Sequence, residues 1–496
     1  MYLETILQAL PRREVIGSTD REVRTLVWDS RVVQPGDVFV ALKERLGHDG
    51  HRFIQSANDR GAIAIVHENQ HSSSGATSVR VPDTHLALAL LSDRFWNSPS
   101  ASLTLIGVTG TNGKTTITYL VESMLLAAGL SVGVIGTAGN RLNRSSLPGP
   151  TSHTTPYPPA LQTHLRTIVD HGGQYAVMEA SSHGLALHRV AGMKFQVACF
   201  TNLTRDHLDF HPDFNAYREA KKLLFSEYLS KTGSAVINAD DPLAEEFAAA
   251  SLGTPLLYGA RANADLQLKS VSQLSARGSQ FTVRLPDGTL LDVAVPLVGR
   301  FNVSNTLAAI GIGVSLRIPI ESILAGVQQV SVPGRMERVD CAQPFSVLVD
   351  YAHTPDALRS ALTSAREWTK GRVIVVFGCG GDRDPGKRPE MGRIAVEGAD
   401  FTIVTSDNPR TESPSAILKD IVQGMPAKAQ YLLIEDRGLA ITEALCSAKE
   451  GDTVLIAGKG HETYQLVGST KLDFDDRLVA RSVLHNRFGV HPGITE

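Results

Sequence analysis

The segment Gly107-Val-Thr-Gly-Thr-Asn-Gly-Lys-Thr-Thr116 is the most informative stretch of this chain. It follows the apolar run Leu103–Ile106 and precedes a helix-like stretch, residues 117–126. A strand, a glycine-rich turn and a helix N-terminus place backbone N–H groups and the positive end of a helix dipole at one point, which favours a bound anion. We therefore predict that this turn binds the phosphates of a nucleoside triphosphate.

The residue types within the turn suit this chemistry. Gly110 and Gly113 let the backbone approach a phosphate closely, and Lys114 can reach the β- and γ-phosphates. The hydroxyl of Thr115 or of Thr116 is expected to ligate Mg²⁺. The general pattern G-x-x-x-x-G-K-[ST] is matched imperfectly, because a valine stands where its first glycine belongs. An ordinary strand–helix turn is the alternative, and the combination of these residues in this context disfavours it.

Length and composition indicate a multidomain enzyme. At about 150 residues per domain, 496 residues predict about three domains. The net charge is −3 and no block of like charges occurs, so neither nucleic acid nor an anionic membrane is expected as a partner. We expect a monomer, because no apolar heptad repeat or exchangeable segment is evident.

Cysteine usage and hydropathy predict a cytoplasmic protein. The first ten residues do not fit a signal peptide, and no stretch approaches the roughly 20 apolar residues that span a bilayer. The cysteines lie far apart, which predicts buried thiols in a reducing compartment rather than disulfides or a zinc site. They are Cys199, Cys341, Cys379 and Cys446.

Strand-like and helix-like segments alternate in three blocks, residues 1–98, 99–333 and 334–496. We predict an α/β protein of three domains, in which a substrate-binding domain precedes a central ATPase domain with a P-loop-type parallel sheet and a Rossmann-like C-terminal domain. Residues 264–298 alternate apolar and polar side chains around Asp287-Gly288, which predicts an antiparallel hairpin. The strand candidates are 37–42, 62–66, 103–106, 175–178, 196–200, 235–237, 346–349, 372–377, 401–404 and 453–456.

Two polar residues follow neighbouring strand candidates of the central block. Glu179 ends one strand, and His207 lies in the segment Thr201–Asp209 after the next. A carboxylate and an imidazole near Lys114 could complete the shell of a Mg²⁺ ion with water and phosphate oxygens. His207 alone would be interpreted as a capped loop histidine. Together with Glu179 and the phosphate turn, a metal ligand is favoured.

Two other features have ordinary interpretations. Lys221 lies on the expected helix 214–225, where spacing alone indicates a surface lysine. Ser182 and His183 could suggest a hydrolase nucleophile and its base. The nucleophile pattern G-x-S-x-G is absent around them, so a catalytic triad is disfavoured.

Five motifs in this order resemble the Mur ligase family of ATP-dependent amide-bond ligases, which also includes folylpolyglutamate synthetases. They are Thr109-Gly-Thr-Asn-Gly-Lys-Thr-Thr116, Glu179-Ala-Ser-Ser-His-Gly184, Asn202-Leu-Thr-Arg-Asp-His-Leu-Asp209, Asn302-Val-Ser-Asn305 and Asp350-Tyr-Ala-His353. Within the family, Asp29-Ser-Arg31 with Pro35-Gly-Asp37 resembles the UDP-binding domain of the branch that adds the third peptide residue. Asp407-Asn-Pro-Arg410 and Gly458-Lys-Gly-His-Glu462 resemble the amino-acid site of that branch. The resemblance runs from about residue 22 to residue 488.

The resemblance implies ATP and Mg²⁺ as cofactors, and a UDP-N-acetylmuramoyl dipeptide and meso-2,6-diaminopimelate as small-molecule substrates. The implied catalytic residues are Lys114, Glu179, His207 and Lys221, and the implied metal ligands are Thr115, Glu179, His207 and a carbamylated Lys221. The implied ATP contacts are Gly110, Thr111, Asn112, Gly113, Lys114, Thr115, Thr116, Asn302, Asn305, Arg335, Asp350 and His353. The implied UDP-muramoyl dipeptide contacts are Trp28, Ser30, Leu46, Gly47, His48, His153, Thr154, Thr155, Ser181, Leu187 and Arg189. The implied diaminopimelate contacts are Arg383, Asp407, Asn408, Pro409, Arg410, Gly458 and Glu462.

Carbamylation of the lysine at position 221 is also implied by the resemblance. A neutral amine that adds CO₂ becomes an anionic oxygen ligand, so a side chain that would repel Mg²⁺ becomes one that binds it. The pattern Tyr217-x-x-Ala-Lys matches Lys221 rather than Lys222. Two positions depart from the family. Trp28 stands where leucine is frequent, and Leu187 stands where glutamine is frequent and cannot donate an amide hydrogen bond.

The implied reaction forms an acyl phosphate on the D-glutamate γ-carboxylate, which the amine of diaminopimelate then attacks, in peptidoglycan precursor synthesis. Arg410 with Arg383 is expected to select the amino acid, although Asp407–Arg410 could also be a simple Asx-Pro turn. An L-lysine-adding ligase of the same branch is the first alternative. A folylpolyglutamate synthetase would not explain residues 22–98. A scaffold that only binds nucleotide would not need Glu179 beside the phosphates.

Overall fold

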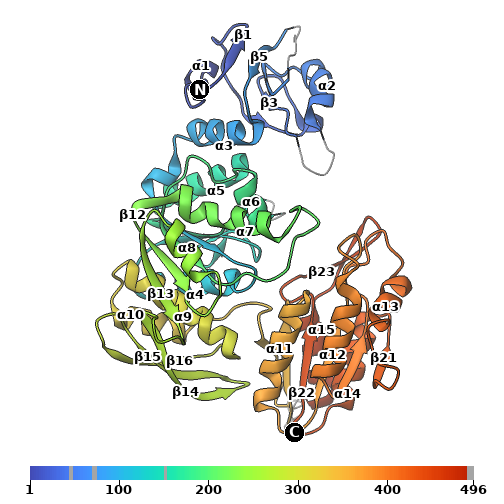
Figure 1. Cartoon of the computed structure of the whole chain (residues 1–496). Helices are drawn as coiled ribbons and strands as arrows, with labels where there is room; N and C mark the ends of the chain where they lie inside the picture. Colours follow the sequence, from blue (N-terminus) through green and yellow to red (C-terminus); the bar gives the residue numbers. More distant parts are fainter. Residues whose placement is uncertain (44–48, 70–74, 150–152, 489–496) are drawn as a thin grey trace, which may run out of the picture. The chain divides into compact units, whose positions relative to one another are not determined.

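The computed structural model describes residues 1–43, 49–69, 75–149 and 153–488. The chain folds into two compact units, Met1–Tyr258 with Ala308–Ile323 and Gly259–Leu307 with Leu324–Glu496. Helices alternate with strands in both units (Figure 1), and the N-terminal, central and C-terminal sheets each contain a run of parallel strands, which confirms the predicted α/β class. The boundaries of the three predicted domains stay a prediction. Within the described ranges, no helix combines the length and apolarity needed to cross a membrane.

The N-terminal sheet has the strand order β1-β5-β4-β3-β2, in which β1 pairs antiparallel and the other pairs are parallel. All residues of β3 and β4 are buried, as their runs of branched side chains predict. Helix α3 packs Ala87, Leu88 and Leu91 into the same core. The elements are α1 (Leu3–Leu7), β1 (Glu14–Ile16), β2 (Leu26–Val27), β3 (Val38–Val40), α2 (Ile54–Asp59), β4 (Ala64–His67), β5 (Thr77–Arg80) and α3 (Thr84–Phe95), with 3₁₀ turns at Ser30–Val32, Gly50–Phe53 and Pro99–Ser102.

The central sheet of the first unit places β6 between β11 and β10, in the order β13-β12-β11-β6-β10-β7-β8-β9. Val108 pairs with Glu179 and Thr109 with Phe200, so the carboxyl ends of three parallel strands meet. Ligands gather at such an edge. The elements are β6 (Thr104–Thr109), α4 (Lys114–Ala127), β7 (Val132–Ile135), β8 (Arg141–Leu142), β9 (Ser145–Ser146), α5 (Pro158–Asp170), β10 (Tyr175–Glu179), α6 (Ser182–Ala186), β11 (Phe195–Phe200), α7 (Phe214–Leu223), a π turn (Leu224–Tyr228), β12 (Leu229–Asn238), α8 (Ala244–Ala250) and β13 (Thr254–Gly259).

The segment predicted as one hairpin forms three antiparallel strands, β14 (Leu266–Ser275), β15 (Gly278–Arg284) and β16 (Leu290–Val295). The turn at Asp287-Gly288 is confirmed between β15 and β16. The sequence analysis missed the earlier turn at Ala276-Arg277, because that dipeptide carries no recognised hairpin signal. Helices α9 (Arg300–Ser315) and α10 (Ile320–Gln328) follow.

The C-terminal sheet has the order β17-β18-β22-β19-β20-β21, and its pairs are parallel except the one made by β17. Val375 of β19 joins a core with α11, α12 and α13, whereas its neighbour Val376 joins a core with α14 and α15. Helices therefore cover both faces of this sheet (Figure 1), as the Rossmann-like prediction requires. The elements are β17 (Glu337–Arg338), β18 (Ser346–Asp350), α11 (Pro355–Trp368), β19 (Val373–Phe377), α12 (Lys387–Gly398), β20 (Phe401–Val404), α13 (Pro414–Val422), β21 (Tyr431–Leu433), α14 (Arg437–Ser447), β22 (Thr453–Ala457), β23 (Tyr464–Val467), β24 (Thr470–Asp473) and α15 (Asp476–Phe488).

The cysteines are free thiols, but their predicted burial is only partly right. Cys199 and Cys379 are buried, Cys341 is half-buried and Cys446 is exposed. The prediction of burial is wrong for Cys446, because it follows the last buried pair of α14, Ala444 and Leu445, and lies outside the apolar stripe of that helix.

Candidate active site

The phosphate turn connects β6 to α4, as predicted. Gly110 and Gly113 have φ angles of 145° and 91°, and a Cβ atom on Gly110 would lie 1.8 Å from Thr201 Oγ1. Position 110 therefore requires glycine. Lys114 is the first residue of α4, and its ammonium group donates to the carbonyl oxygens of Gly110 and Thr111 at 2.8 Å each. A lysine and the positive end of a helix thus meet at one turn.

The loop after β11 is held against this turn. Asn112 N–H donates to Asn202 Oδ1 at 3.0 Å, and Thr111 N–H donates to the carbonyl oxygen of Asn202 at 2.9 Å. Thr201 Oγ1 donates to the carbonyl oxygen of Asn112 at 2.6 Å. The backbone that leads to His207 is thereby fixed relative to the phosphate turn.

Glu179 lies at the end of β10 beside the turn. Its Oε1 accepts hydrogen bonds from Thr115 Oγ1 and from the Thr137 backbone N–H, both at 2.9 Å, and its Oε2 accepts one from Thr137 Oγ1 at 3.0 Å. Both candidate threonines are buried, and it is Thr115 whose hydroxyl donates to the Glu179 carboxylate. Sequence reasoning missed Thr137. Gly136, which precedes Thr137, was the available signal in the sequence. In the structure a Cβ atom at this position would lie 2.4 Å from Glu179 Oε1, which explains the glycine.

Lys221 lies on α7 with its amine buried against the phosphate turn. Its side chain is 1% exposed, and Nζ donates to the carbonyl oxygen of Gly110 at 2.7 Å. The interpretation as a surface lysine is therefore wrong, because this side of α7 packs onto the sheet edge. Burial, with the positive charge of Lys114 as the second cause, holds the pKa of Lys221 well below its usual value. Lys222 instead pairs with Glu219 and Glu246 at the surface.

His207 lies in the loop after β11, with Nε2 at 3.4 Å from Asp206 Oδ2. Burial lowers the pKa of His207 to about 4, and the nearby Lys221 and Lys114 contribute to this shift. A neutral imidazole is the form that ligates metals. The ring of His183 lies 4.8 Å from that of His207. Within the described ranges Ser182 Oγ, at 1% residue exposure, makes no hydrogen bond, so the geometry lends no support to a Ser–His pair.

Few side chains that could ligate a metal ion lie beside the phosphate turn. The described residues contain no group of three or more His, Cys, Asp and Glu arranged to hold a metal ion. The predicted set supplies one carboxylate from Glu179, one imidazole from His207 and the hydroxyl of Thr115. A divalent ion here would need further oxygens, and phosphate, water or a modified Lys221 could supply them.

A second group of predicted residues gathers around Thr155, beyond Glu179. Thr155 Oγ1 donates to the carbonyl oxygen of Glu179 at 2.8 Å and lies 3.0 Å from Ser181 Oγ. Arg189 is buried and donates through Nη1 to the carbonyl oxygen of Thr155 at 2.7 Å. Thr154 Oγ1 lies 2.9 Å from Thr137 Oγ1. These contacts bring the predicted sugar–peptide contacts next to the phosphate turn.

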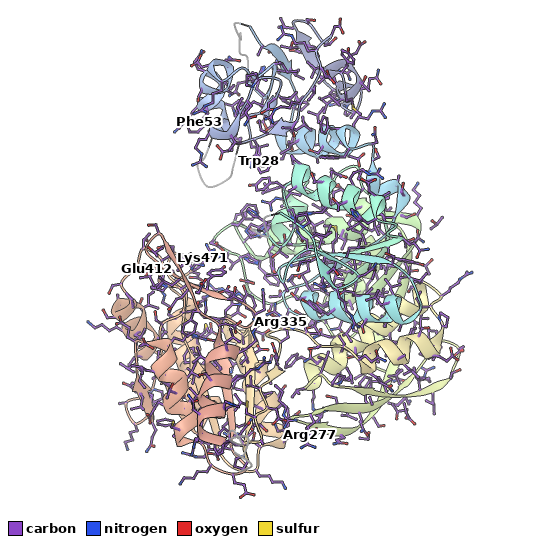
Figure 2. All side chains as sticks on the ribbon, turned by 180° about the vertical axis from the view of Figure 1, so that it is seen from behind. Trp28, Phe53, Arg277, Arg335, Glu412 and Lys471 are labelled. Carbon is purple, nitrogen blue, oxygen red and sulfur yellow. The ribbon has the colours of Figure 1, made fainter. Side chains whose placement is uncertain are left out.

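Tyr157 is at the centre of this second group, and sequence reasoning missed it. Its ring stacks on Trp28, labelled in Figure 2, with centroids 4.9 Å apart. The Arg189 guanidinium lies 4.0 Å from the Tyr157 centroid, and the His153 ring meets Tyr157 edge-on at 5.2 Å. The stacking of Tyr157 on Trp28 explains how a large aromatic side chain is accommodated at position 28. The other predicted contacts are Ser30 and Leu187, which are buried, and Leu46, Gly47 and His48, which lie outside the described residues.

The remaining predicted ATP contacts lie in the second unit. Asn302 Nδ2 donates to the carbonyl oxygen of Val298 at 2.8 Å, and Asn305 Nδ2 donates to Asn302 Oδ1 at 3.0 Å. Asp350 accepts the backbone N–H groups of Met336 and Ala352, and burial raises its pKa. Two further contacts flank Tyr351: the Arg335 guanidinium (labelled in Figure 2) lies 4.3 Å from that ring, and the His353 ring lies 4.6 Å from it.

The predicted amino-acid site is assembled at the carboxyl ends of β20 and β22. Asp407 Oδ1 accepts the Asn408 N–H at 2.7 Å, and Asn408 Nδ2 donates to Glu462 Oε2 at 2.9 Å. A Cβ atom on Gly458 would lie 2.6 Å from Asp407 Oδ2, so only glycine fits there. Lys459, which sequence reasoning passed over, joins the same network and is completely buried.

Arg410 and Arg383 converge on Gly380. Arg410 Nη1 donates to the carbonyl oxygen of Gly381 at 2.6 Å and would lie 2.9 Å from a Cβ atom on Gly380, while Arg383 Cγ would lie 3.9 Å from it. Pro409 lies between Asn408 and Arg410, and the backbone of Arg410 is in the left-handed region, with a φ angle of 52°. Arg410 also pairs with β23 through its backbone, so the segment is more than an isolated Asx-Pro turn.

The two arginine-bearing loops are joined by the buried Arg388. Its guanidinium donates to Glu412 Oε1 at 2.8 Å and to Asp420 Oδ2 at 2.9 Å. Glu412, labelled in Figure 2, also accepts the backbone N–H of Asp382. The loops that carry Arg383 and Arg410 are therefore connected to each other and to α13.

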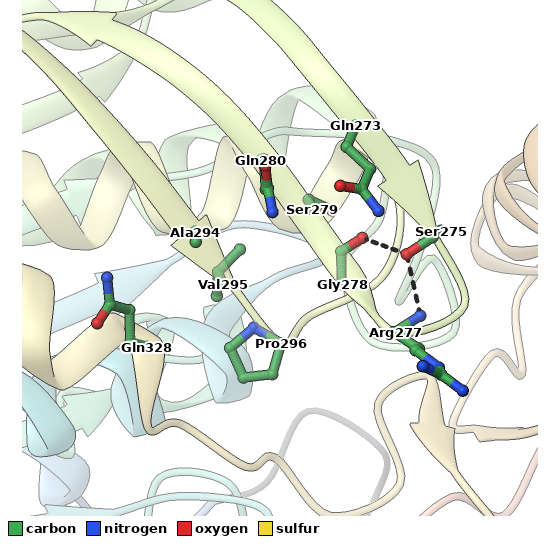
Figure 3. A pocket seen from close by; sticks show the side chains of 10 residues that line it. All are labelled: Gln273, Ser275, Arg277, Gly278, Ser279, Gln280, Ala294, Val295, Pro296 and Gln328. Atoms are coloured by element: carbon green, nitrogen blue, oxygen red, sulfur yellow. Dashed lines mark hydrogen bonds between the residues drawn. The ribbon is translucent and has the colours of Figure 1, made fainter.

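A separate hollow of about 260 Å³ lies on the β14–β16 strands (Figure 3). None of the predicted site residues lines it. Its charged lining residue is Arg277, and the rest of its wall is polar amides, hydroxyls and small apolar groups. The lining residues are Gln273, Ser275, Arg277, Gly278, Ser279, Gln280, Ala294, Val295, Pro296 and Gln328.

Comparisons with known proteins identify the family of this chain. Residues 108–313 match the Mur ligase middle domain, and residues 334–460 match the Mur ligase, glutamate ligase domain. A UDP-N-acetylmuramoyl-L-alanyl-D-glutamate–2,6-diaminopimelate ligase of Gloeobacter violaceus is 48% identical over 94% of this chain and 95% of its own. The protein of the same name from Geobacillus thermodenitrificans is 43% identical over 98% of this chain and all of its own.

Solved structures give the same result. The structure of a UDP-N-acetylmuramoyl-L-alanyl-D-glutamate–2,6-diaminopimelate ligase matches with a TM-score of 0.69 and 34% identity, covering 98% of this chain and 99% of the other. A folylpolyglutamate synthase of Mycobacterium tuberculosis, complexed with ADP and AMPPCP, shares the fold at 17% identity and a TM-score of 0.61, covering 83% of this chain and 96% of its own. By sequence and by fold, the chain belongs to the Mur ligase family.

Proposed function

We propose that this protein is the ATP-dependent ligase that adds meso-2,6-diaminopimelate to the D-glutamate of UDP-N-acetylmuramoyl-L-alanyl-D-glutamate, a step of peptidoglycan precursor synthesis. The names of relatives that match over nearly the full chain supply the substrates. The single structural observation that carries the proposal is the buried Lys221 amine against the Gly110 carbonyl. Burial of a lysine next to a phosphate turn costs stability, which a catalytic use explains.

The reaction divides into two steps. The γ-carboxylate of D-glutamate attacks the γ-phosphorus of ATP, which forms an acyl phosphate and releases ADP. The amine of diaminopimelate then attacks the acyl carbon, and phosphate and a proton leave as the amide forms. Lys114 stabilises negative charge on the phosphoryl oxygens. Its amine donates to two backbone carbonyls in the structure, and phosphate oxygens can replace these as acceptors.

The donors beside the turn suit Mg²⁺ when Lys221 is carbamylated. Thr115 and Glu179 offer oxygens, His207 is neutral, and a carbamate on Lys221 would add an anionic oxygen donor. Bound Mg²⁺ would neutralise charge on the transferred phosphoryl group. The lowered pKa of Lys221 supports this proposal, because a larger fraction of the amine is then neutral at pH 7 and able to add CO₂.

Two further sites complete the proposal. The UDP-muramoyl dipeptide binds around Trp28, Thr155, Ser181 and Arg189, and the contacts made by Tyr157 support this placement. The predicted contacts of the second unit, Asn302, Asn305, Arg335, Asp350 and His353, bind the nucleotide. We also propose that the protein acts in the cytoplasm as a monomer.

Arg410 is proposed to select diaminopimelate over L-lysine. The two amino acids differ by the carboxylate at the far end, which a guanidinium binds bidentately and which lysine lacks. Arg410→Ala is expected to lower kcat/KM for meso-diaminopimelate by about tenfold or more, the usual cost of a lost charge-assisted hydrogen bond. Turnover of L-lysine should change much less. The measurement is kcat/KM for both amino acids in both proteins.

A matched control is Arg393→Ala. Arg393 pairs with Glu397 on the exposed side of α12, away from the loops that carry Arg383 and Arg410. Its kinetic constants should equal those of the native protein. Equal discrimination between the two amino acids before and after Arg410→Ala would remove Arg410 from the selectivity mechanism.

Phosphate release tests the ligase reaction itself. With ATP present, release should require both the UDP-muramoyl dipeptide and an amino acid, because the acyl phosphate forms on the first and is resolved by the second. Release with ATP alone at the full rate would indicate a simple ATPase. No release under any combination would indicate a nucleotide-binding scaffold.

A further inference from the structure

Lys459 lies at the carboxyl end of β22, and the fold fixes its backbone on both sides. Gly458 and Gly460 have φ angles of 117° and 52°. A Cβ atom on Gly458 would lie 2.6 Å from Asp407 Oδ2, and one on Gly460 would lie 2.7 Å from Tyr351 Cβ. The Lys459 side chain has 0% exposure. Its amine is therefore held at one place by the packing of neighbouring strand ends.

The amine forms a closed triangle with two residues of the predicted amino-acid site. Lys459 Nζ donates to Asn408 Oδ1 at 3.1 Å and to Glu462 Oε2 at 3.0 Å, and Asn408 Nδ2 donates to the same Glu462 oxygen at 2.9 Å. The backbone N–H of Leu466 donates to Asn408 Oδ1 at 2.9 Å. Asn408 Oδ1 accepts two hydrogen bonds and Asn408 Nδ2 donates one, and these three bonds fix the orientation of the Asn408 amide.

The triangle also distinguishes the two carboxylate oxygens of Glu462. Both side-chain bonds to its carboxylate end on Oε2, so Oε1 is the oxygen left to accept a donor from the amino acid. The Glu462 side chain is 16% exposed. A buried ammonium requires a paired anion, and Glu462 provides it at 3.0 Å. Without Lys459, the carboxylate would retain one amide partner and could rotate.

We propose that Lys459 is a positioning residue for the amino-acid substrate. It acts through Glu462 and Asn408, holding Oε2 so that Oε1 faces an ammonium group of the incoming amino acid. This inference rests on the proposed function, because it takes the Asp407–Arg410 and Gly458–Glu462 segments as the amino-acid site. It adds a residue that would itself make no contact with the substrate.

Lys459→Met keeps the length of the side chain and removes its charge. We expect the KM for meso-diaminopimelate to rise about tenfold or more, the fold-change for a misplaced charge-assisted contact. The KM values for ATP and the UDP-muramoyl dipeptide should stay within about twofold, because an interaction with one substrate affects that substrate's binding. Lys459→Arg keeps the charge, so its KM for meso-diaminopimelate should stay close to that of the native protein.

A double-mutant cycle separates positioning from a general loss of structure. Glu462→Gln alone should raise the KM for the amino acid, and Lys459→Met should raise it less in this background than in the native protein, since the Lys459–Glu462 ion pair is already lost. The double variant carries no unpaired buried charge, so its thermal unfolding checks that the domain is intact.

Three outcomes would overturn the inference: equal increases in all three KM values, fully additive effects in the cycle, or an unchanged KM in Lys459→Met. Each of these outcomes has this meaning when the native protein forms the amide product. If the native protein forms no amide product, the proposed function fails first, and the two failures are thereby distinguished.

Discussion

Lys114→Ala is expected to lower kcat by at least about 10²–10³-fold, the cost of removing one preorganised donor from a charged transition state. The magnitude follows from the position of Lys114, at the first residue of α4 with its amine at the phosphate turn. Binding of ATP should weaken less than turnover, because charge develops during phosphoryl transfer.

The measurement is kcat from phosphate release with all three substrates at saturation. Lys194→Ala is the matched control, since Lys194 is exposed and donates to the Glu227 carbonyl oxygen away from the turn. That variant should keep native kcat. A near-native kcat in Lys114→Ala would mean that this turn is not the catalytic phosphate site.

Lys221→Ala is expected to abolish detectable turnover, and a short carboxylic acid added in solution is expected to restore part of it. The added acid can occupy the cavity of the missing side chain and supply an oxygen donor in place of the carbamate. The prediction depends on Lys221 being buried and its pKa being lowered by burial, both of which favour a neutral, reactive amine.

The neighbour Lys222 provides the control. Its amine pairs with Glu219 and Glu246 at the surface, and these partners raise its pKa and keep it charged. Lys222→Ala should therefore retain native activity. Labelled CO₂ followed by carbon-13 NMR gives a readout independent of turnover: the native protein and Lys222→Ala should show a carbamate signal that Lys221→Ala lacks. An unmodified Lys221 ammonium in a crystal structure with Mg²⁺ and nucleotide bound would contradict the prediction.

Several strands of the central and C-terminal sheets were predicted from continuous runs of branched side chains, among them β10, β11, β19, β20 and β22, whereas β7, β13 and β21 were not predicted. Phe401–Val404 was predicted with the bounds found for β20, and residues 372–377 differ from β19 by one residue. The turn between β14 and β15 was missed because its central residues, Ala276-Arg277, include no glycine or asparagine. The strands and turns that were predicted are therefore those whose own residues carry a recognisable pattern.

Site residues were predictable where a motif carried the chemistry, and not where tertiary contacts did. Lys114 follows from the turn alone, whereas the burial of Lys221 depends on how α7 packs against the sheet edge, and spacing indicated a surface residue. Tyr157 and Thr137 are not charged, and only their contacts with Trp28 and Glu179 single them out. Lys459 stands in a motif that was recognised, yet its role appears only from its bonds.

The most direct test of the account is an amino-acid panel with the native protein. Amide product is measured with ATP, UDP-N-acetylmuramoyl-L-alanyl-D-glutamate and either meso-2,6-diaminopimelate or L-lysine, and kcat/KM is determined for each. We expect meso-diaminopimelate to be preferred by about 10²-fold or more, because lysine leaves the arginines Arg383 and Arg410 without a carboxylate partner. Preference for L-lysine, or no amide product with either amino acid, would contradict the account.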